Sequence, residues 1–352
     1  FKTGLYSALA AASLPVLLWY GRVASTPIIH TGLAMFAIAA AVWAIRPLRP
    51  APSVERQFIG WVLCGLAMGG AILTVGPLAV LTVAGPILLI LVLCPGRASH
   101  TLGLLAAMLI AVLLAMPWAL VAHDRGPQAW DHWLGPLGEA LQLNLQGLLE
   151  KGVTRLGVLV AALLPWTLWL IGAGIQPFST SSVGVRMRMF IGWAWFAYAG
   201  VLFLLLPHDG RPADMLPVLP VGAVLVGQLF RQYSDRAAEG RPTRFWRWLR
   251  WPHLVGLLVI SLLVPLVILA QPYLMQRLNV SARLLGPTPA WFAIGLVGVL
   301  IALALLCGHW LHRQHHGRLL VCWSVWMLGL SATVIVPIVT GDWMRTPPRT
   351  DA

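Results

Sequence analysis

The sequence is poor in charged side chains: Asp, Glu, Lys and Arg make up 10% of its 352 residues, whereas 59% are hydrophobic. Several apolar runs approach the roughly 20 residues with which a helix crosses a bilayer. The runs are too long for the alternating strands of about 10 residues that form membrane barrels. The composition therefore predicts an all-α, polytopic transmembrane bundle in which each helix satisfies its own backbone.

Acidic residues are few, 11 in all, and there are only four cysteines. We place every acid in a loop, and this disfavours an ion-coupled pump, which needs carboxylates inside the membrane. The cysteines lack Cys-x-x-Cys spacing, so neither a disulfide framework nor a metal cluster is indicated. The net charge is +13. In a membrane protein, basic residues mainly determine which loops stay in the cytoplasm, so we expect no nucleic-acid partner.

We predict about eleven membrane spans from the apolar runs. They are, approximately, residues 4–20, 28–45, 58–75, 77–94, 101–121, 153–174, 189–206, 214–230, 253–271, 289–307 and 319–340. The chain begins with Phe1, and no basic segment with a cleavage site precedes the first run. We therefore expect further sequence upstream.

Basic residues are distributed unequally when these spans are threaded alternately through a bilayer. With residues 1–3 in the cytoplasm, that side carries fifteen basic residues and the other side nine, in agreement with the positive-inside rule. The cytoplasmic side includes the six-arginine loop 231–252, whose alternative role is to bind anionic lipid. It also includes a histidine-rich stretch that we interpret as an interfacial loop, not a metal site, because it lacks carboxylates and cysteines. Its histidines are His309, His312, His315 and His316.

The densest polar cluster of the sequence then lies on the outer side, in LLLPHDGRPADMLPVLP (204–220). The segment 21–27, the turn 74–77 and the long loop 122–152 lie on the same side. In 122–152, tryptophans and leucines recur at steps of three and four, which predicts an amphipathic helix in the outer interface. This helix either packs against the bundle or shields the entrance for a lipid substrate.

Several stretches resemble motifs of polytopic, lipid-carrier-dependent glycosyltransferases of the GT-C type, which include the aminoarabinose transferase and the protein O-mannosyltransferases. These stretches are GRVASTPII (21–29), GLAMGGAILTVGPLAVL (65–81), the pair MPWALV (116–121) and LPWTLWL (164–170), and RPADMLPVLP (211–220). The resemblance implies a glycosyltransferase-like membrane core in residues 1–230. Residues 231–352 then add transmembrane helices without a soluble domain.

By this resemblance, the chain is expected to move a sugar from a polyprenyl-phosphate carrier to a lipid, polysaccharide or protein acceptor. The reaction would take place on the outer face of a bacterial inner membrane. Pro27, Val75 and Asp214 depart from the family pattern, which has an acid, a lysine and often a tyrosine there. The family's catalytic carboxylate lies in an outer loop upstream of the matched region, so the catalytic residue is left unassigned.

The chemistry of such a transfer needs a cation for the departing phosphate and a base for the acceptor hydroxyl. Guanidinium pairs bidentately with phosphate, so Arg211 is the leading substrate-binding candidate and Arg22 the second. The other substrate-binding candidates are His208 and His123, and the weak candidates for the base are Asp209, Asp214 and Asp124. No metal site is assigned, although two of these carboxylates could hold a divalent ion against the phosphate.

Each candidate also has a purely structural explanation. HDGRP is a good turn sequence, and a carboxylate at position 214 would stabilise the first turn of the following helix. Two other functions are also compatible with the composition. A lipid or oligosaccharide flippase would share the many helices and the basic cytoplasmic side, and a non-catalytic relative that binds the carrier would explain Pro27 and Val75.

Overall fold

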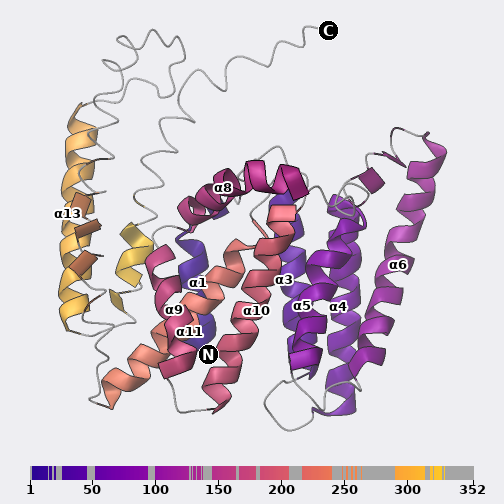
Figure 1. Cartoon of the computed structure of the whole chain (residues 1–352), viewed down its shortest axis with the longest axis horizontal. Coiled ribbons are helices and arrows are strands. Elements are labelled where there is room, and N and C mark those ends of the chain that lie inside the picture. The colour runs from indigo at the N-terminus through magenta and orange to yellow at the C-terminus, as the bar shows by residue number, and fades with distance from the viewer. Residues whose placement is uncertain are drawn as a thin grey trace, which may run out of the picture. The chain divides into compact units, whose positions relative to one another are not determined.

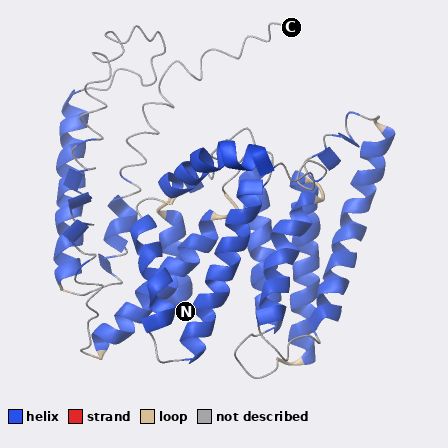
Figure 2. Cartoon of the chain, viewed as in Figure 1, coloured by secondary structure: helices blue, strands red, loops and turns tan. Residues whose placement is uncertain are grey.

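The computed structural model describes helices and turns, with no strand among the residues whose placement it gives (Figure 2). The described residues are 2–14, 16–17, 20, 26–45, 52–93, 100–126, 128, 130–131, 133–135, 137, 145–163, 166–179, 183–205, 216–239, 248, 251–252, 255–256, 258–259, 263, 290–313, 318–319, 321–326 and 329. The prediction of an all-α chain is confirmed.

Ten helices of at least eleven residues are described (Figure 1). They are α1 (Lys2–Ala12), α3 (Thr26–Ile45), α4 (Val54–Val75), α5 (Leu78–Leu93), α6 (Thr101–Asp124), α8 (Leu145–Ala162), α9 (Thr167–Ser179), α10 (Val183–Leu205), α11 (Leu219–Ala238) and α13 (Ala290–His312). The chain forms two compact units, residues 20–226 and residues 1–19 with 227–352. The candidate site lies within 20–226.

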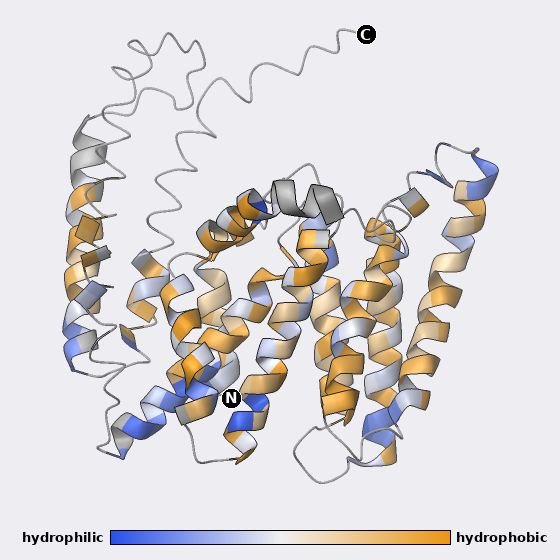
Figure 3. Cartoon of the chain, viewed as in Figure 1, coloured by the Kyte–Doolittle hydropathy of each residue, from blue (hydrophilic) through white to orange (hydrophobic). Residues whose placement is uncertain are grey.

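Four described helices, α3, α4, α6 and α10, are long and apolar enough to cross a membrane. Helix α5 and residues 297–310 form shorter apolar helices. Figure 3 shows hydrophobic residues along the middle of α4, α5 and α6, with hydrophilic residues toward helix ends. The chain is therefore a multi-pass membrane protein, while the number of eleven spans stays a prediction.

Two predicted spans are wrong as continuous helices. The predicted span 4–20 is interrupted because α1 ends at Ala12, and the predicted span 153–174 is split into α8 and α9. In both places a proline, Pro15 or Pro165, lies at the interruption. Proline removes a backbone donor and disfavours the helical conformation of the residue before it. A hydrogen bond of 2.8 Å from the Thr167 hydroxyl to the Val160 carbonyl bridges the second interruption.

Helix α8 extends beyond the predicted amphipathic segment of 122–152. Figure 1 shows α8 crossing near the end of α10, at a steep angle to its neighbours. Helix α8 begins at Leu145, where the predicted amphipathic segment of 122–152 is almost over. The described residues 128, 130–131, 133–135 and 137 of the predicted segment are also helical, and its place in the outer interface stays a prediction.

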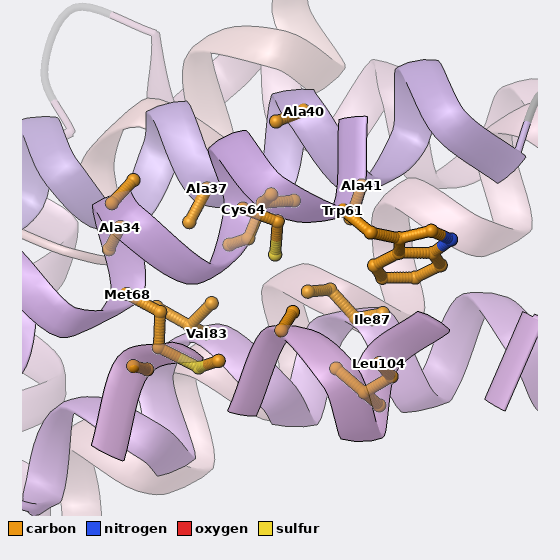
Figure 4. Packing of buried hydrophobic residues seen from close by; sticks show 14 of the residues in the cluster. Ala34, Ala37, Ala40, Ala41, Trp61, Cys64, Met68, Val83, Ile87 and Leu104 are labelled. Carbon is orange, nitrogen blue, oxygen red and sulfur yellow. The ribbon is translucent and has the colours of Figure 1, made fainter. Parts of the chain in front are cut away.

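Small residues bring α3, α4 and α6 close together. A side chain at Gly60 would meet Ala44 at 2.7 Å, and one at Gly65 would meet the carbonyl of Ala107 on α6 at 2.8 Å. Such glycines let membrane helices approach until their backbones nearly touch. Figure 4 shows the resulting core, where Cys64 packs among alanines of α3. Cys64 and Cys307 are buried free thiols, as the sequence indicated.

Two predictions about polar residues, that every acid lies in a loop and that His309 and His312 lie in a loop, are corrected by the positions of the helix ends. Helix α11 continues to Ala238, so Asp235 lies inside it and pairs with Arg231 at 3.5 Å. Glu55 likewise lies in the first turn of α4, so the prediction that every acid lies in a loop is wrong. Helix α13 extends through His309 and His312, which therefore end a helix instead of lying in a loop. The glutamate and the aspartate both lie within a turn of a helix end.

Candidate functional site

A small cavity of about 30 Å³ lies between α3, α5 and α10, beside the turn 216–218. Its lining is largely apolar and comes from four places in the sequence. The lining residues are Ala34 and Met35 of α3, Thr82 and Pro86 of α5, Trp195, Tyr198, Ala199, Leu202 and Phe203 of α10, and Pro217 and Val218 of the turn.

The cavity occupies the half of the bundle that we predict to be the outer half. Helices α3 and α5 begin on that side and α10 ends there, if the spans alternate as predicted. Thr82 lies about one helical turn, or 6 Å, from the start of α5, and Pro86 about 12 Å from it. Arg186 and Arg188 are exposed at the opposite end of α10. Thr82 thus lies nearer to the start of α5 than Pro86 does.

Two hydroxyl groups in the lining already have hydrogen-bond partners. The Thr82 hydroxyl donates to the Ala79 carbonyl at 2.9 Å, and its oxygen lies 3.2 Å from Nε2 of buried His30. Which of the two atoms, Nε2 of His30 or the threonine oxygen, donates in this contact depends on the histidine tautomer. The Tyr198 hydroxyl donates to the Leu81 carbonyl at 2.7 Å and so joins α10 to α5.

Proline and glycine shape the same wall of α5. Pro86 has no N–H, so the carbonyl of Thr82, four residues earlier, loses its usual helical donor. Thr82 and Pro86 both line the cavity. A side chain at Gly85 would collide with the Tyr198 hydroxyl, so glycine is what lets the tyrosine reach the backbone of α5.

Replacing Tyr198 with phenylalanine is expected to loosen the contact between α10 and α5. The change removes one partly buried neutral hydrogen bond, for which we expect a loss of about 0.5–1.5 kcal/mol in the free energy of unfolding. Thermal unfolding of the purified protein in detergent measures this loss. An unchanged midpoint would mean that this hydrogen bond does not contribute to the stability of the contact.

A buried arginine that the sequence analysis did not select lies near the end of α10. Arg155 of α8 is only 9% exposed, and its Nη1 donates to the carbonyl of Leu204 at 2.6 Å. The last carbonyls of a helix have no partner inside it, and a cation there also matches the helix dipole. An arginine inside the apolar run of a predicted span was the signal that could have identified it.

The structure separates the predicted site residues into two groups. His123 and Asp124 are exposed at the end of α6 and do not line the cavity, and the His123 ring meets Trp130 edge-on at 5.3 Å. The other candidates, which are Arg22, His208, Asp209, Arg211 and Asp214, lie outside the described residues. Helix α11 is described from Leu219 on, so the prediction that Asp214 lies in the first turn of this helix falls outside the described residues.

Residues that flank the polar cluster in the sequence line the cavity. Phe203, near the end of α10, and Pro217, just before α11, both line the cavity. The segment 206–215 itself lies outside the described residues.

The turn at 76–77 contacts the long loop 122–152, and both were predicted to lie on the outer side of the membrane. Gly76 has φ of 75°, and a side chain there would collide with the carbonyl of Trp133. Trp133 and Val75 both pack against the core cluster of α3 to α6. The side chain of Val75, which takes the place of the family's lysine, is thus partly buried and packs against this core.

Among the described residues, no three His, Cys, Asp or Glu side chains are grouped so that they could hold a metal ion. His208, Asp209, Asp214, His315 and His316 lie outside the described residues.

Comparison with solved structures identifies the fold. The chain resembles ArnT from Cupriavidus metallidurans bound to undecaprenyl phosphate, with a TM-score of 0.63, 17% identity and coverage of 96% of this chain and 57% of that one. The same protein in its apo state matches with a TM-score of 0.53 and 18% identity, over 96% of this chain and 61% of that one. The chain thus shares the fold of this protein over the aligned region.

Sequence relatives point to the same class of proteins. The undecaprenyl phosphate-alpha-4-amino-4-deoxy-L-arabinose arabinosyl transferase of Serratia proteamaculans is 26% identical over 181 residues, 50% of this chain and 31% of that protein. The corresponding transferase of Pseudomonas aeruginosa is 31% identical over 191 residues, 52% of this chain and 33% of that protein. The matched region spans about a third of these relatives, and no family model matches. The similarity predicted from the motifs is confirmed.

Proposed function

We propose that this protein is a glycosyltransferase that moves a sugar from a polyprenyl-phosphate carrier to an acceptor on the outer face of a membrane. The observation that carries the proposal is the apolar cavity whose wall borders both ends of the polar segment 206–215. Similarity to arabinosyl transferases and to the fold of ArnT supports it.

The reaction would transfer the sugar's anomeric carbon between two oxygens. The acceptor hydroxyl attacks that carbon, the bond to the phosphate oxygen breaks, and the hydroxyl proton passes to a base. The carrier phosphate leaves with one more negative charge, which Arg211 would stabilise through two parallel N–H···O bonds. Arg22 is the second candidate for this role.

The identity of the base is a weaker part of the proposal. Asp209 and Asp214, with His208, belong to the segment that borders the cavity and are the first residues to test. His123 and Asp124 lie exposed at the end of α6, which makes them less suitable for a reaction beside the cavity. A carboxylate upstream of Phe1, as in the family motif, is the alternative.

The substrates and the location follow from the relatives' names. An aminopentose carried on a polyprenyl phosphate is the first donor to test, because the relatives are named for 4-amino-4-deoxy-L-arabinose. The acceptor would be a membrane lipid, a polysaccharide or a protein. Because the relatives are bacterial, we propose the inner membrane, with the active face outward, as the basic residues of the loops suggest.

A flippase is the second candidate function, and one observation favours it. Pro86 inside α5 and the interruption between α8 and α9 are features that transporters use at substrate sites. A carrier-binding relative without activity is a third reading, motivated by Pro27 and Val75.

Reconstituted vesicles can separate these functions. The full-length protein is incubated with an acceptor membrane extract and a polyprenyl-phosphate aminopentose radiolabelled in the sugar. Label that moves to the acceptor supports the transferase. Label that crosses the bilayer while it is still on the carrier would favour the flippase, and binding without either event would favour the inactive relative.

A further inference from the structure

We propose that the end of α13 is a binding site for an anionic phospholipid of the cytoplasmic leaflet. Arg313 and Arg318 hold the phosphate of the headgroup, beside the indole of Trp310. The inference goes beyond the proposed function and does not depend on sugar transfer. It gives a role to the basic stretch 309–318, which that function leaves unused.

Positive charge collects at this end of the helix, and no acid lies near it in the sequence. Arg313 and Arg318 are exposed, as are His309 and His312. The sequence has no Asp or Glu between residues 290 and 341. The predicted topology places this end of α13 in the cytoplasm, where the leaflet carries anionic lipids. The charge of the site therefore fits the headgroups that this side of the membrane supplies.

An aromatic ring holds Arg318 in place. The guanidinium carbon lies 4.6 Å from the centre of the Trp310 ring, and the His309 ring meets Trp310 edge-on, with 5.1 Å between the ring centres. A cation–π contact uses the face of the ring and no hydrogen-bond acceptor, so it orders Arg318 without pairing the N–H groups that bind phosphate. Tryptophan also favours the headgroup level of a membrane. The arginine is thus held at the depth where a lipid phosphate lies.

One face of α13 matches the shape of a phospholipid and not that of a free anion. Val299, Ala302, Leu306, His309 and Arg313 follow one another at steps of three and four, and all are exposed. Residues with this spacing share one face of a helix. At 1.5 Å per residue, the apolar part from Val299 to Leu306 is about 10 Å long, and Arg313 lies about 10 Å beyond it. Figure 3 shows α13 hydrophobic along its middle and hydrophilic at this end. An acyl chain can therefore follow the apolar part while the headgroup reaches the arginines.

Helix capping explains only part of the basic cluster. Basic side chains are favoured in the last turn of a helix by its dipole, and the N–H of Arg313 donates to the His309 carbonyl at 3.0 Å. Arg318 comes after the end of the helix and is directed back over Trp310. The dipole of α13 does not require this second arginine, whereas a phosphate with two acceptor oxygens does use it.

Two pairs of exposed arginines provide a matched test. Arg313 and Arg318 form the proposed site, whereas Arg186 and Arg188 lie near the start of α10, on the same predicted side of the membrane. Each pair is replaced with glutamine, so both variants lose two positive charges. Native mass spectrometry of the whole chain in detergent measures the Kd for dioleoylphosphatidylglycerol. Dioleoylphosphatidylcholine, which has the same acyl chains and no net charge, is measured in parallel.

We expect Arg313→Gln/Arg318→Gln to raise the Kd for phosphatidylglycerol about tenfold, with Arg186→Gln/Arg188→Gln within about twofold of the unmodified protein. Phosphatidylcholine should bind all three proteins weakly and alike. Equal Kd values of the two variants for phosphatidylglycerol would overturn the inference, because any charge on this side would then attract the lipid. Equal binding of the two lipids by the unmodified protein would also overturn it.

A soluble anion and a folding defect are separated from lipid binding in the same experiment. Glycerol phosphate, which carries the phosphate without acyl chains, should not displace phosphatidylglycerol, and displacement at equal concentrations would reject the lipid as the ligand. If the double variant lowers the thermal midpoint, Arg313→Gln alone changes one exposed side chain and should raise the Kd about threefold. An unchanged Kd in that variant would overturn the inference. Loss of sugar transfer would bear on the proposed function alone.

Discussion

Replacing Arg211 with alanine is expected to lower the rate of sugar transfer by about 100-fold or more, with protein expression and thermal midpoint nearly unchanged. Charge accumulates on the carrier phosphate as the glycosidic bond breaks, so a guanidinium there stabilises the transition state more than the bound substrate. The effect should therefore fall mainly on kcat. Initial rates with a radiolabelled polyprenyl-phosphate sugar, at several donor concentrations, separate kcat from KM.

Two companion variants make the Arg211 result specific. Arg211→Lys keeps the positive charge but loses the planar fork, so it should retain an intermediate rate. Arg125→Ala removes an exposed arginine at the end of α6, a helix that does not line the cavity, and should leave transfer unchanged. A rate for Arg211→Ala within about threefold of the unmodified protein would remove this residue from the mechanism.

Hydropathy was enough to predict the helices α3, α4, α5 and α6, because a bilayer requires long apolar helices and little else could satisfy these backbones. It failed at α1, α8 and α9, where the apolar run continues through a break in the helix. Pro15 and Pro165 marked both breaks, but prolines also occur inside the described helices α5 and α6. Local sequence does not say which proline a membrane helix tolerates, because neighbouring helices help to satisfy the freed carbonyls.

From the sequence, the candidate site could be predicted only as a set of polar residues on the outer side of the membrane, without their arrangement in space. Sequence indicated that the segment 204–220 carries the polar cluster, and the structure adds that the cavity wall lies at both of its ends. Nothing in the sequence could reveal the cavity, because it forms between α3, α5 and α10, which are distant in the chain. Tyr198 contacts the backbone 117 residues away, at Leu81, and that distance in sequence has no local signal.

The sequence also hid the role of Arg155. We had counted it among the outer basic residues of a predicted span, where its position suggested only topology. Once α8 is seen to lie across the bundle, the same residue reaches the carbonyl of Leu204 at the end of α10. A single misplaced helix boundary was therefore enough to conceal a buried arginine beside the proposed site.

Replacing Arg155 with alanine is expected to lower the free energy of unfolding by about 1.5–3 kcal/mol, because a charge-assisted hydrogen bond to Leu204 is lost. The last turn of α10 would then fray, since its carbonyls have no partners within the helix. Hydrogen–deuterium exchange followed by mass spectrometry measures this, and faster exchange should be confined to the end of α10 and to α8.

The matching control for Arg155 is an arginine at the opposite end of α10 from Leu204. Arg188 is exposed near the start of α10, so Arg188→Ala should change neither the thermal midpoint nor the exchange near Leu204. Arg155→Lys keeps a cationic donor and should restore part of the protection. Because Phe203 lines the cavity one residue before Leu204, fraying there should also weaken carrier binding. Unchanged exchange at the end of α10 in Arg155→Ala would show that this arginine does not order the cavity wall.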